Sequence, residues 1–508
     1  MKSINRFTLG IVLGVFLLSS CSDYLDINTN PNAPTETIPD FVLSGALVNT
    51  ANIKSGAIPA FAGYWGGYYA SSGSYSQSGD VRRSYNLLNT SFQGTWTALY
   101  ANAANYNLVE TQASAIEDYD YFVAVAKIMK AYVFQNLVDI YGKVPYSEAL
   151  KGFDNLAPAY DDDMDIYEAL ADEFDAAIDI IQNAPSAAKS LNLNVKDIMF
   201  GGDTDKWARF ANTLKLRLLL RQSEVAGRAA YISTEIAQIV SNGAGFLGAG
   251  EDAMINPGYT KANNLQNPFW EANGLTAGDA VSGRDFNKVS NYFYSQLTVK
   301  ADPRVDYFLR APGDKPGTNT KARPYKCVDF GALPETAINS DNTSGFGTAV
   351  LGGPDKPLMM LSAAQSMFLQ AEAVLRGWIT GDAQELFETG IEESFRQVIG
   401  SSAGASTYYT SGTTDTDWSV ATTTDEQLHA IITQKWIANF AVDCLEAWAD
   451  FRRLGIPSVA GSIDPQRLGD VMPVRLLYPQ LEYNNNAAQV AKLGTISQFT
   501  SSIFWDVN

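Results

Sequence analysis

Histidine and cysteine are scarce in this sequence. Its 508 residues include one histidine, His429, and three cysteines, Cys21, Cys327 and Cys444. A single histidine excludes a Ser-His-Asp or Cys-His catalytic arrangement elsewhere in the chain, and a histidine-rich metal site. No loop has the Asp, Asn, Gly and Glu spacing of an EF-hand, so we expect neither a metal nor a cofactor; the alternative is a calcium ion at Asp161-Asp-Asp163 or elsewhere. Three cysteines are too few for a disulfide framework, and Cys327 and Cys444 can either pair or stay as two buried free thiols.

Basic residues are also in short supply. Lys and Arg total 36 against 55 Asp and Glu, which gives a formal net charge of −19. Nucleic-acid phosphates require basic surfaces, so this balance excludes nucleic acid as a partner. It also argues against charge-driven adhesion to anionic lipid headgroups. Any membrane attachment must therefore come from another feature of the chain.

The only long apolar run lies at the N-terminus. Lys2 and Arg6 precede an apolar stretch over residues 7–18, which is too short to span a bilayer and leads into Leu18-Ser-Ser-Cys21. A basic start, a short apolar stretch and small residues before a cysteine predict a lipoprotein signal peptide over residues 1–20. Cleavage leaves Cys21 as an N-terminus that carries acyl chains such as palmitate, and two or three chains anchor a protein stably. The alternative is an ordinary signal peptide followed by an incidental cysteine.

The rest of the chain divides into a tether and one body. Residues 21–40 are rich in Pro and Asn and predict a lipidated N-terminal tether. Residues 41–508 contain no linker, charge block or low-complexity tract, so we expect a single, mostly helical domain. Apolar residues at steps of three and four predict its helices. These helices cover residues 120–140, 165–184, 205–222, 362–378, 383–398 and 426–454.

Some of these helices are predicted to form pairs. Residues 362–378 and 383–398 resemble a tetratricopeptide unit, and 120–140 with 165–184 is a second candidate pair. The spacing between pairs is irregular, which argues against a regular solenoid. Residues 243–360 are rich in Gly, Asn and Pro and lack helical periodicity. Irregular stretches of this size are typical of binding loops, so we expect long packed loops inserted into a helical frame.

Aromatic residues concentrate in one segment. Residues 61–75 contain six aromatics, where the chain average of 12% predicts about two. Rings stack on the apolar faces of sugars, while hydroxyl and guanidinium groups supply hydrogen bonds. The candidate ligand-binding residues are Trp65, Tyr68, Tyr69 and Tyr75, completed by Trp96, Trp270 of the 267–270 loop and Arg284, with Arg82 as a further donor. The helical spacing of Tyr64, Trp65 and Tyr68 supports the alternative that these rings are buried in the core.

Short motifs occur in a fixed order from Leu18-Ser-Ser-Cys21 to the last residues of the chain. They are Asp139-Ile-Tyr-Gly-Lys-Val-Pro-Tyr-Ser-Glu-Ala149, Trp207-Ala-Arg-Phe-Ala-Asn-Thr-Leu-Lys-Leu-Arg217, Asp302-Pro-Arg304, Ala371-Glu-Ala373, Arg376-Gly-Trp378, Thr433-Gln-Lys-Trp436, Phe451-Arg-Arg-Leu-Gly-Ile-Pro457 and Pro473-Val-Arg-Leu-Leu-Tyr-Pro479. In this order they resemble the SusD/RagB family of nutrient-binding outer-membrane lipoproteins. The match extends over most of the chain.

The resemblance implies a mostly α-helical frame of four tetratricopeptide-like helix pairs, with long irregular loops that carry the ligand site. It implies a surface-exposed lipoprotein of the outer membrane that captures a nutrient and passes it to a partner TonB-dependent transporter. A glycan is the favoured nutrient, and the resemblance implies a binding protein without catalytic residues. The alternatives are a peptide-binding lipoprotein of the same family, a carbohydrate-active enzyme, and a purely structural lid on the transporter.

Overall fold

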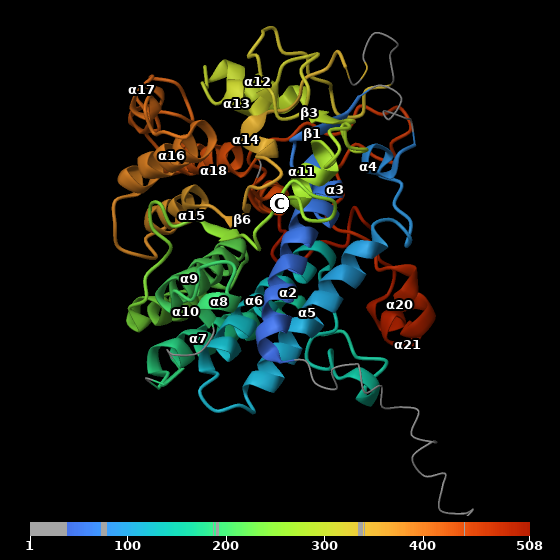
Figure 1. Cartoon of the computed structure of the whole chain (residues 1–508), viewed down its shortest axis with the longest axis vertical. Helices are drawn as coiled ribbons and strands as arrows, with labels where there is room; N and C mark the ends of the chain where they lie inside the picture. The colour runs from blue at the N-terminus through green and yellow to red at the C-terminus, as the bar shows by residue number, and fades with distance from the viewer. Residues whose placement is uncertain are drawn as a thin grey trace, which may run out of the picture.

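The computed structural model of the protein describes residues 38–72, 79–185, 187–188, 193–333, 339, 341–440 and 442–508. The predicted signal peptide, Cys21 and nearly all of the predicted tether lie outside these residues, as does Tyr75. Within the described part of the chain, no helix combines the length and the apolar character needed to cross a membrane. The protein is mostly α-helical, as the sequence predicts (Figure 1).

A row of helices forms the first half of the frame, and each helix packs against the next (Figure 1). In order, these helices are α2 (Pro39–Asn52), α5 (Gln93–Ala113), α6 (Asp120–Tyr141), α7 (Asp163–Asn183) and α9 (Thr204–Arg221). α10 (Ala229–Asn242) then covers α7 and α9. The contact between α6 and α7 confirms the second helix pair that the sequence predicts.

α6 illustrates how the sequence determines helix packing in the first half of the frame. Its apolar stripe is buried against α5 and α7. Lys127 and Lys130 lie off that stripe, and both form ion pairs with Glu110 on α5, with N–O distances of 2.9 and 2.5 Å. The helix ends at Gly142, whose φ of +71° is unfavourable for a residue with a Cβ. The amphipathic pattern thus directs the packing, and the glycine ends the helix.

Four helices form the second half of the frame. They are α15 (Ala363–Leu375), α16 (Ala383–Ile399), α18 (Thr424–Asn439) and α19 (Cys444–Leu454). α15 packs against α16 and α18, and it also contacts α9, which joins the two halves. The side chains of Ser362 and Asp382 cap α15 and α16 by accepting hydrogen bonds from first-turn N–H groups. The predicted pair of helices over 362–398 is confirmed.

Residues 426–454 form two helices, which corrects the prediction of a single long one. Phe440 leaves the helical region with a ψ of +70°, directly after α18. Asp443 then starts α19, because its carboxylate accepts a hydrogen bond from the Glu446 N–H at 3.2 Å. Asp side chains commonly make such caps, and these local bonds compete with a continuous helix.

Strands tie the irregular region to the rest of the protein. The described residues form three two-stranded antiparallel sheets. β1 (Tyr69–Ser71) pairs with β3 (Asn287–Val289), β2 (Ala253–Ile255) with β6 (Leu358–Leu361), and β4 (Leu309–Arg310) with β5 (Gly345–Phe346). The β2–β6 pair joins the two ends of the predicted loop region, and β1–β3 joins that region to the segment after α3 (Pro59–Trp65). The region is therefore packed, as predicted.

Short helices fill the connections. The α-helical ones are α4 (Val81–Ser84), α8 (Leu193–Lys196), α11 (Pro268–Asn273), α12 (Asn291–Val299), α13 (Val305–Phe308), α14 (Thr348–Leu351), α17 (Ala405–Tyr409), α20 (Gln480–Asn485) and α21 (Ala487–Val490). η1 (Ile53–Ala57) is a π-helical turn, and η3 (Gly152–Asp154), η5 (Trp418–Val420) and η6 (Ala491–Leu493) are 3-10 turns.

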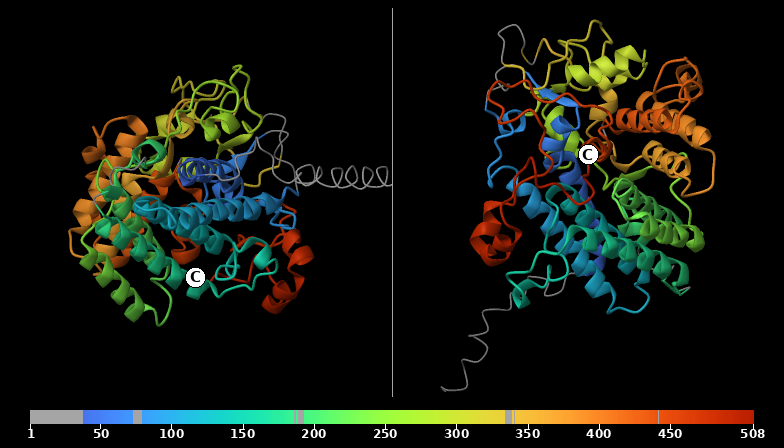
Figure 2. Two further views of the ribbon diagram at one scale, coloured as in Figure 1. Left: turned by 60° about the horizontal axis from the view of Figure 1, so that its bottom comes forward. Right: turned by 180° about the vertical axis from the view of Figure 1, so that it is seen from behind.

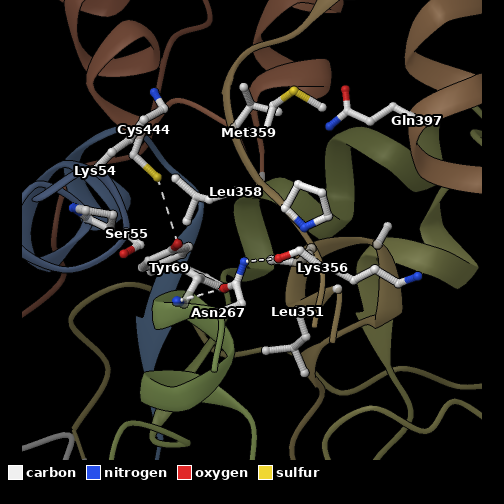
Figure 3. A pocket seen from close by; sticks show the side chains of 17 residues that line it. Lys54, Ser55, Tyr69, Asn267, Leu351, Lys356, Leu358, Met359, Gln397 and Cys444 are labelled. Carbon is white, nitrogen blue, oxygen red and sulfur yellow. Dashed lines mark hydrogen bonds between the residues drawn. The ribbon is translucent and has the colours of Figure 1, made fainter. Parts of the chain in front are cut away.

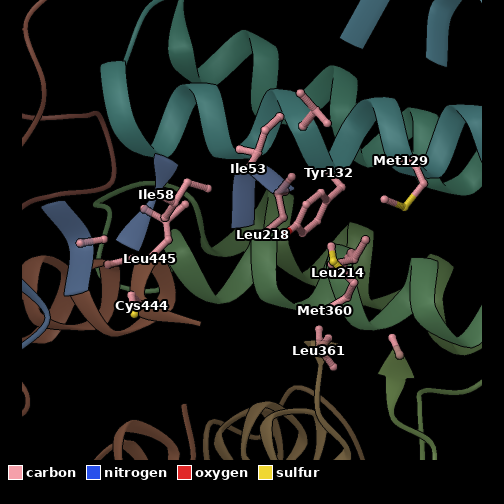
Figure 4. Packing of buried hydrophobic residues seen from close by; sticks show 14 of the residues in the cluster. Ile53, Ile58, Met129, Tyr132, Leu214, Leu218, Met360, Leu361, Cys444 and Leu445 are labelled. Atoms are coloured by element: carbon pink, nitrogen blue, oxygen red, sulfur yellow. The ribbon is translucent and has the colours of Figure 1, made fainter. Parts of the chain in front are cut away.

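One large apolar core joins the two halves. Its members include Ile53 and Ile58, Met129 and Tyr132 of α6, Leu214 and Leu218 of α9, Met360 and Leu361 of β6, and Leu445 of α19 (Figure 4). A smaller cluster around Phe368 and Phe387 lies between α15, α16 and α18. The segment after α19 runs across the back of the molecule (Figure 2), where the Leu476 N–H donates to the carbonyl of Ile140 at 3.0 Å. This contact fixes the C-terminal segment against the end of α6.

Candidate functional site

Two adjoining pockets lie where η1, α3, β1, α11 and the segment from α14 to β6 meet. We call them the Lys54 pocket, of about 150 Å³, and the Arg284 pocket, of about 160 Å³. Ser55, Pro59, Tyr69 and Phe269 line both pockets, so we treat the two as one site, the Tyr69 site. The polar residues that line the Lys54 pocket include Lys54, Asn267, Lys356, Gln397 and Cys444 (Figure 3). Residues that line only the Arg284 pocket include Arg82, Asn273, Arg284, Phe286 and Asn287.

Local backbone structure positions these side chains. Lys54 and Ser55 belong to η1, and π-helical turns of this kind often occur at functional sites. Asn267 caps α11, because its side-chain oxygen accepts a hydrogen bond from the Phe269 N–H at 2.9 Å. The Asn267 amide also donates to the carbonyl of Lys356 at 2.9 Å (Figure 3). These two bonds hold α11 against the segment that leads into β6, and they fix the backbone of Phe269.

Tyr69 lies where the two pockets meet. Its ring packs against Phe346, with a centroid separation of 4.8 Å, and the Cys444 thiol donates to its hydroxyl at 3.8 Å (Figure 3). Burial raises the pKa of Tyr69 well above its usual value, so the hydroxyl stays neutral. Gly63 makes the ring position possible, because a Cβ there would lie 2.3 Å from a ring carbon of Tyr69.

Two cations of the site are held by carboxylates behind it. The Lys54 ammonium lies 2.9 Å from the Asp443 carboxylate. Burial alone would lower the pKa of Lys54, but Asp443 raises it above the usual value, so Lys54 stays charged. Arg82 donates from Nε and Nη2 to both oxygens of Asp80, at 2.7 and 2.6 Å, and from Nη1 to the Tyr64 hydroxyl at 3.2 Å. These pairs fix both cations at the wall of the site.

Trp65 and Tyr68 belong to the core, which corrects their prediction as ligand contacts. Both side chains are 0% exposed. Trp65 packs on Trp448 with a centroid separation of 5.2 Å. Tyr68 stacks on Trp436 at 5.3 Å and donates its hydroxyl hydrogen to the Trp436 carbonyl at 2.6 Å. A ring without exposed surface cannot stack on a ligand, so the alternative of core burial holds for these residues and for Tyr64.

Trp96 and Trp270 are also buried, and neither lines the Tyr69 site. Trp96 belongs to an aromatic cluster with Tyr100 and Tyr141, at centroid separations of 4.8 and 4.9 Å. Trp270 packs against Gly317, where a Cβ would lie 2.5 Å from the indole ring. The structure therefore brings neither ring to the Tyr69 site, which corrects these two assignments.

Tyr69 and Arg284 are the predicted residues that line the site, together with the predicted donor Arg82. Tyr75 lies outside the described residues. Sequence reasoning missed Lys54 and Phe269. The sequence does contain a signal for Phe269, because this residue lies beside Trp270 in the predicted 267–270 loop. Nothing in the sequence marks Lys54 as a site residue, because no motif surrounds it.

The side chains that line the Tyr69 site can bind a ligand through cationic, amide, hydroxyl and aromatic groups. No carboxylate is among the described residues that line it. His429 of α18 does not line it either, and its Nδ1 lies 2.7 Å from an oxygen of Asp415, which precedes η5. Among the described residues, no group of three or more His, Cys, Asp or Glu side chains is placed to hold a metal. Cys327 and Cys444 are free thiols, and burial raises the pKa of Cys444 to about 12.

Larger grooves follow α10. One of about 940 Å³ is lined by Ile232, Ile236 and Val240 of α10 and by Trp378, and a neighbouring groove of about 680 Å³ shares Val240. These grooves run between helices of the frame. We assign the ligand site to the Tyr69 site instead, because cationic, amide and hydroxyl groups converge there on aromatic rings.

Comparisons with known proteins find relatives that match most of the chain. The family model described as "Starch-binding associating with outer membrane" matches residues 31–479. A solved structure of a chitin-binding SusD homolog from Flavobacterium johnsoniae is 26% identical, with a TM-score of 0.75, and the match covers 92% of this chain and 99% of that chain. A SusD-like protein from Bacteroides thetaiotaomicron, 24% identical with a TM-score of 0.74, shares the fold over 92% of this chain and 99% of its own. A comparison with curated proteins finds no match.

Proposed function

The chain belongs to the SusD-like family of outer-membrane-associated proteins, and on this premise we propose that it captures a glycan at the Tyr69 site and passes it to a partner TonB-dependent transporter. The observation that carries the proposal is the meeting of Tyr69 and Phe269 with Asn267, Arg82 and Arg284 in two adjoining pockets. The half-buried ring of Phe269 offers a stacking surface to a sugar, whereas Tyr69, at 3% exposed, forms part of the wall. Amide and guanidinium groups bind sugar hydroxyls. The chitin-binding relative supports a glycan over a peptide as the ligand.

In this proposal, Cys21 holds the protein on the outer membrane. Residues 1–20 are a signal peptide, residues 21–40 are a lipidated tether, and residues 41–508 are one nutrient-binding domain. Surface exposure places the Tyr69 site where it meets glycans before they reach the transporter. The protein binds without catalysis, because the Tyr69 site has no pair of carboxylates for glycoside hydrolysis among its described residues.

A glycan and peptide array, probed with the soluble chain that begins after Cys21, tests the ligand. We expect saturable binding to one or more oligosaccharides and no change in their length during incubation. Binding to peptides alone would replace the glycan proposal with a peptide-binding function. Shortened oligosaccharides would show an enzyme, and no saturable binding at all would leave the role of a structural lid.

Affinity purification of the native lipoprotein from outer membranes tests the partner. We expect a large outer-membrane transporter to copurify in a defined ratio. The matched control is the Cys21→Ala variant, which lacks the acyl anchor. This variant should neither stay with the outer membrane nor copurify with the transporter. A native lipoprotein that is recovered alone would contradict the partner proposal without affecting the glycan proposal.

A further inference from the structure

Every charged residue among the described residues that line the Tyr69 site is basic. These residues are Lys54 and Lys356 in the Lys54 pocket, and Arg82 and Arg284 in the Arg284 pocket. The chain as a whole has the opposite balance, with 55 acidic and 36 basic residues. From this contrast we infer that the site takes an acidic oligosaccharide, one that carries carboxylate or sulfate groups. The inference rests on the proposed glycan-binding function and specifies its ligand class.

Two of the four cations already have carboxylate partners within the protein. The Lys54 and Asp443 side chains are both 6% exposed and lie 2.9 Å apart. Asp80 binds Arg82 with both of its oxygens. Burial alone would raise the pKa of Asp80, but the hydrogen bonds and charge of Arg82 lower it below its usual value, so Asp80 stays ionised. Lys54 and Arg82 therefore act as fixed hydrogen-bond donors, each held against a carboxylate of the protein.

Arg284 and Lys356 are different. Both side chains are exposed, and neither forms an ion pair with any described residue. The contact found for the Arg284 guanidinium is a long one, from Nη1 to the Gly56 carbonyl at 3.5 Å. A guanidinium presents five N–H donors in a planar fork that fits a carboxylate or sulfate, so most of this binding capacity is available.

The two uncompensated cations lie in different pockets of the same site. Lys356 lines the Lys54 pocket, and Arg284 lines the Arg284 pocket. Tyr69 and Phe269, which line both, provide the surface between them. A ligand that contacts both cations must therefore extend across both pockets, which an oligosaccharide chain can do. An oligomer with an acid group on successive units can meet one cation in each pocket.

The net charge of the protein makes this local arrangement selective. A chain of net charge −19 repels anionic ligands at long range. Charge-assisted hydrogen bonds are about twice as strong as neutral ones, and two uncompensated cations provide them at one place. A neutral glycan gains less from these cations, because it forms only neutral-acceptor hydrogen bonds with them. The site therefore distinguishes acidic from neutral oligosaccharides of the same length.

Matched ligands test this distinction in the full-length lipoprotein in detergent. The probes are oligogalacturonates and their methyl esters, which remove the charge with little change in shape, sulfated chondroitin oligosaccharides with desulfated counterparts, and neutral chitin and starch oligomers. Isothermal titration at low salt should show at least one acidic probe binding about tenfold or more tightly than its neutral counterpart. Added salt should weaken that binding, because screening acts on exposed charges.

Two variants locate the effect. Arg284→Gln and Lys356→Gln should each weaken acidic binding about tenfold and reduce its salt dependence, while the melting temperature stays unchanged because both side chains are exposed. Lys261→Gln is the matched control, because Lys261 is an exposed cation that pairs with Asp279 and lines neither pocket. It should change neither binding nor stability.

The outcomes separate this inference from the proposed function. Equal binding of acidic and neutral members of every pair would overturn the inference and leave glycan capture intact. Binding of neutral probes alone would do the same. A protein that binds no oligosaccharide but binds an acidic peptide would overturn both. Acidic binding that survives both variants would place the acid groups elsewhere and contradict the roles given to Arg284 and Lys356.

Discussion

Arg453 on α19 and Glu372 on α15 form a fully buried, bidentate ion pair. Nη1 and Nη2 of Arg453 lie 2.5 and 2.9 Å from Oε1 and Oε2 of Glu372, and both side chains are 0% exposed. Arg453 also donates to Asp450 at 3.0 Å, and Lys435 of α18 lies 2.8 Å from Asp450 and 3.0 Å from Glu446. Three of the motifs that carry the family resemblance thus meet in one buried network, which joins α15, α18 and α19.

Glu372→Gln should lower the unfolding free energy by on the order of 3–5 kcal/mol, because it removes one charge of a buried pair. Burial alone raises the pKa of Glu372, but Arg453, with Arg376 and Lys435, lowers it to about 2. A carboxyl whose pKa is lower in the folded state contributes stability above its unfolded pKa of 4.5 and loses it as the pH falls toward 2. Urea unfolding at about pH 7, 4 and 3 should show wild type and variant converging as the pH falls.

Glu385→Gln is the control for this experiment. Glu385 lies on α16 with an exposed side chain and forms no ion pair among the described residues. Its replacement should change stability by no more than about 0.5 kcal/mol at any of these pH values. A Glu372→Gln variant as stable as wild type at neutral pH, or a difference that does not change with pH, would contradict a stabilising role for the pair.

The frame could be predicted because its helices carry their signal locally. The apolar stripe of α6 and the glycine at 142 both lie within the helix and its end. The helix break that was predicted wrongly depends on a distant contact. The interruption between α18 and α19 places Phe440 against Phe293, with ring centroids 4.3 Å apart. Periodicity does not record a contact between segments far apart in the sequence.

The site could be predicted only in part, for the same reason. Tyr68 and Tyr69 are neighbours, and composition cannot distinguish them. β1 starts at Tyr69 and pairs it with Val289, while the carbonyl of Tyr68 accepts from the Ser290 N–H at 2.8 Å. Successive residues of an extended segment point to opposite sides. Both rings are buried, but this pairing gives them different neighbours, and only Tyr69 also borders the pockets. The deciding partner lies more than 200 residues away in the sequence.

Gly63→Ala should disturb the Tyr69 site. The added Cβ would lie 2.3 Å from the Tyr69 ring, so the ring must move. We expect a loss of about 1–3 kcal/mol of stability, as for other overpacked core positions, together with weaker glycan binding. Gly45→Ala in α2 is the matched control, because its Cβ meets nothing within 4 Å. Thermal unfolding and glycan titration of both variants provide the measurement, and normal binding by Gly63→Ala would place the ligand away from Tyr69.

Cys21→Ala should release the protein from the outer membrane or leave an uncleaved precursor. The sequence Leu18-Ser-Ser-Cys21 predicts cleavage before the cysteine and acylation of it. Membrane fractionation and mass spectrometry of the N-terminus measure both steps. Cys327→Ala is the control, because Cys327 is a free thiol inside the folded domain and should not affect attachment. An unmodified Cys21 in the native protein, or cleavage at another position, is incompatible with the prediction.

Phe269 and Trp270 are neighbours on α11 that should respond differently to replacement by alanine. Phe269 is half-buried and lines both pockets, whereas Trp270 is 7% exposed and lines neither. A ring that stacks on a ligand contributes roughly 1–3 kcal/mol, so Phe269→Ala should weaken glycan binding about tenfold or more with little loss of stability.

Trp270→Ala should instead cost on the order of 3–5 kcal/mol of stability, because it leaves a cavity beside Gly317. Each variant is therefore the control for the other, and both are measured by urea unfolding and by titration with a glycan that the array identifies. Binding is compared at a temperature where both variants are folded, so that loss of structure is not read as loss of affinity. If Phe269→Ala binds normally, the ligand does not stack on this ring. If Trp270→Ala is fully stable but binds weakly, the tryptophan is a ligand contact after all, and the assignment of these two rings must be exchanged.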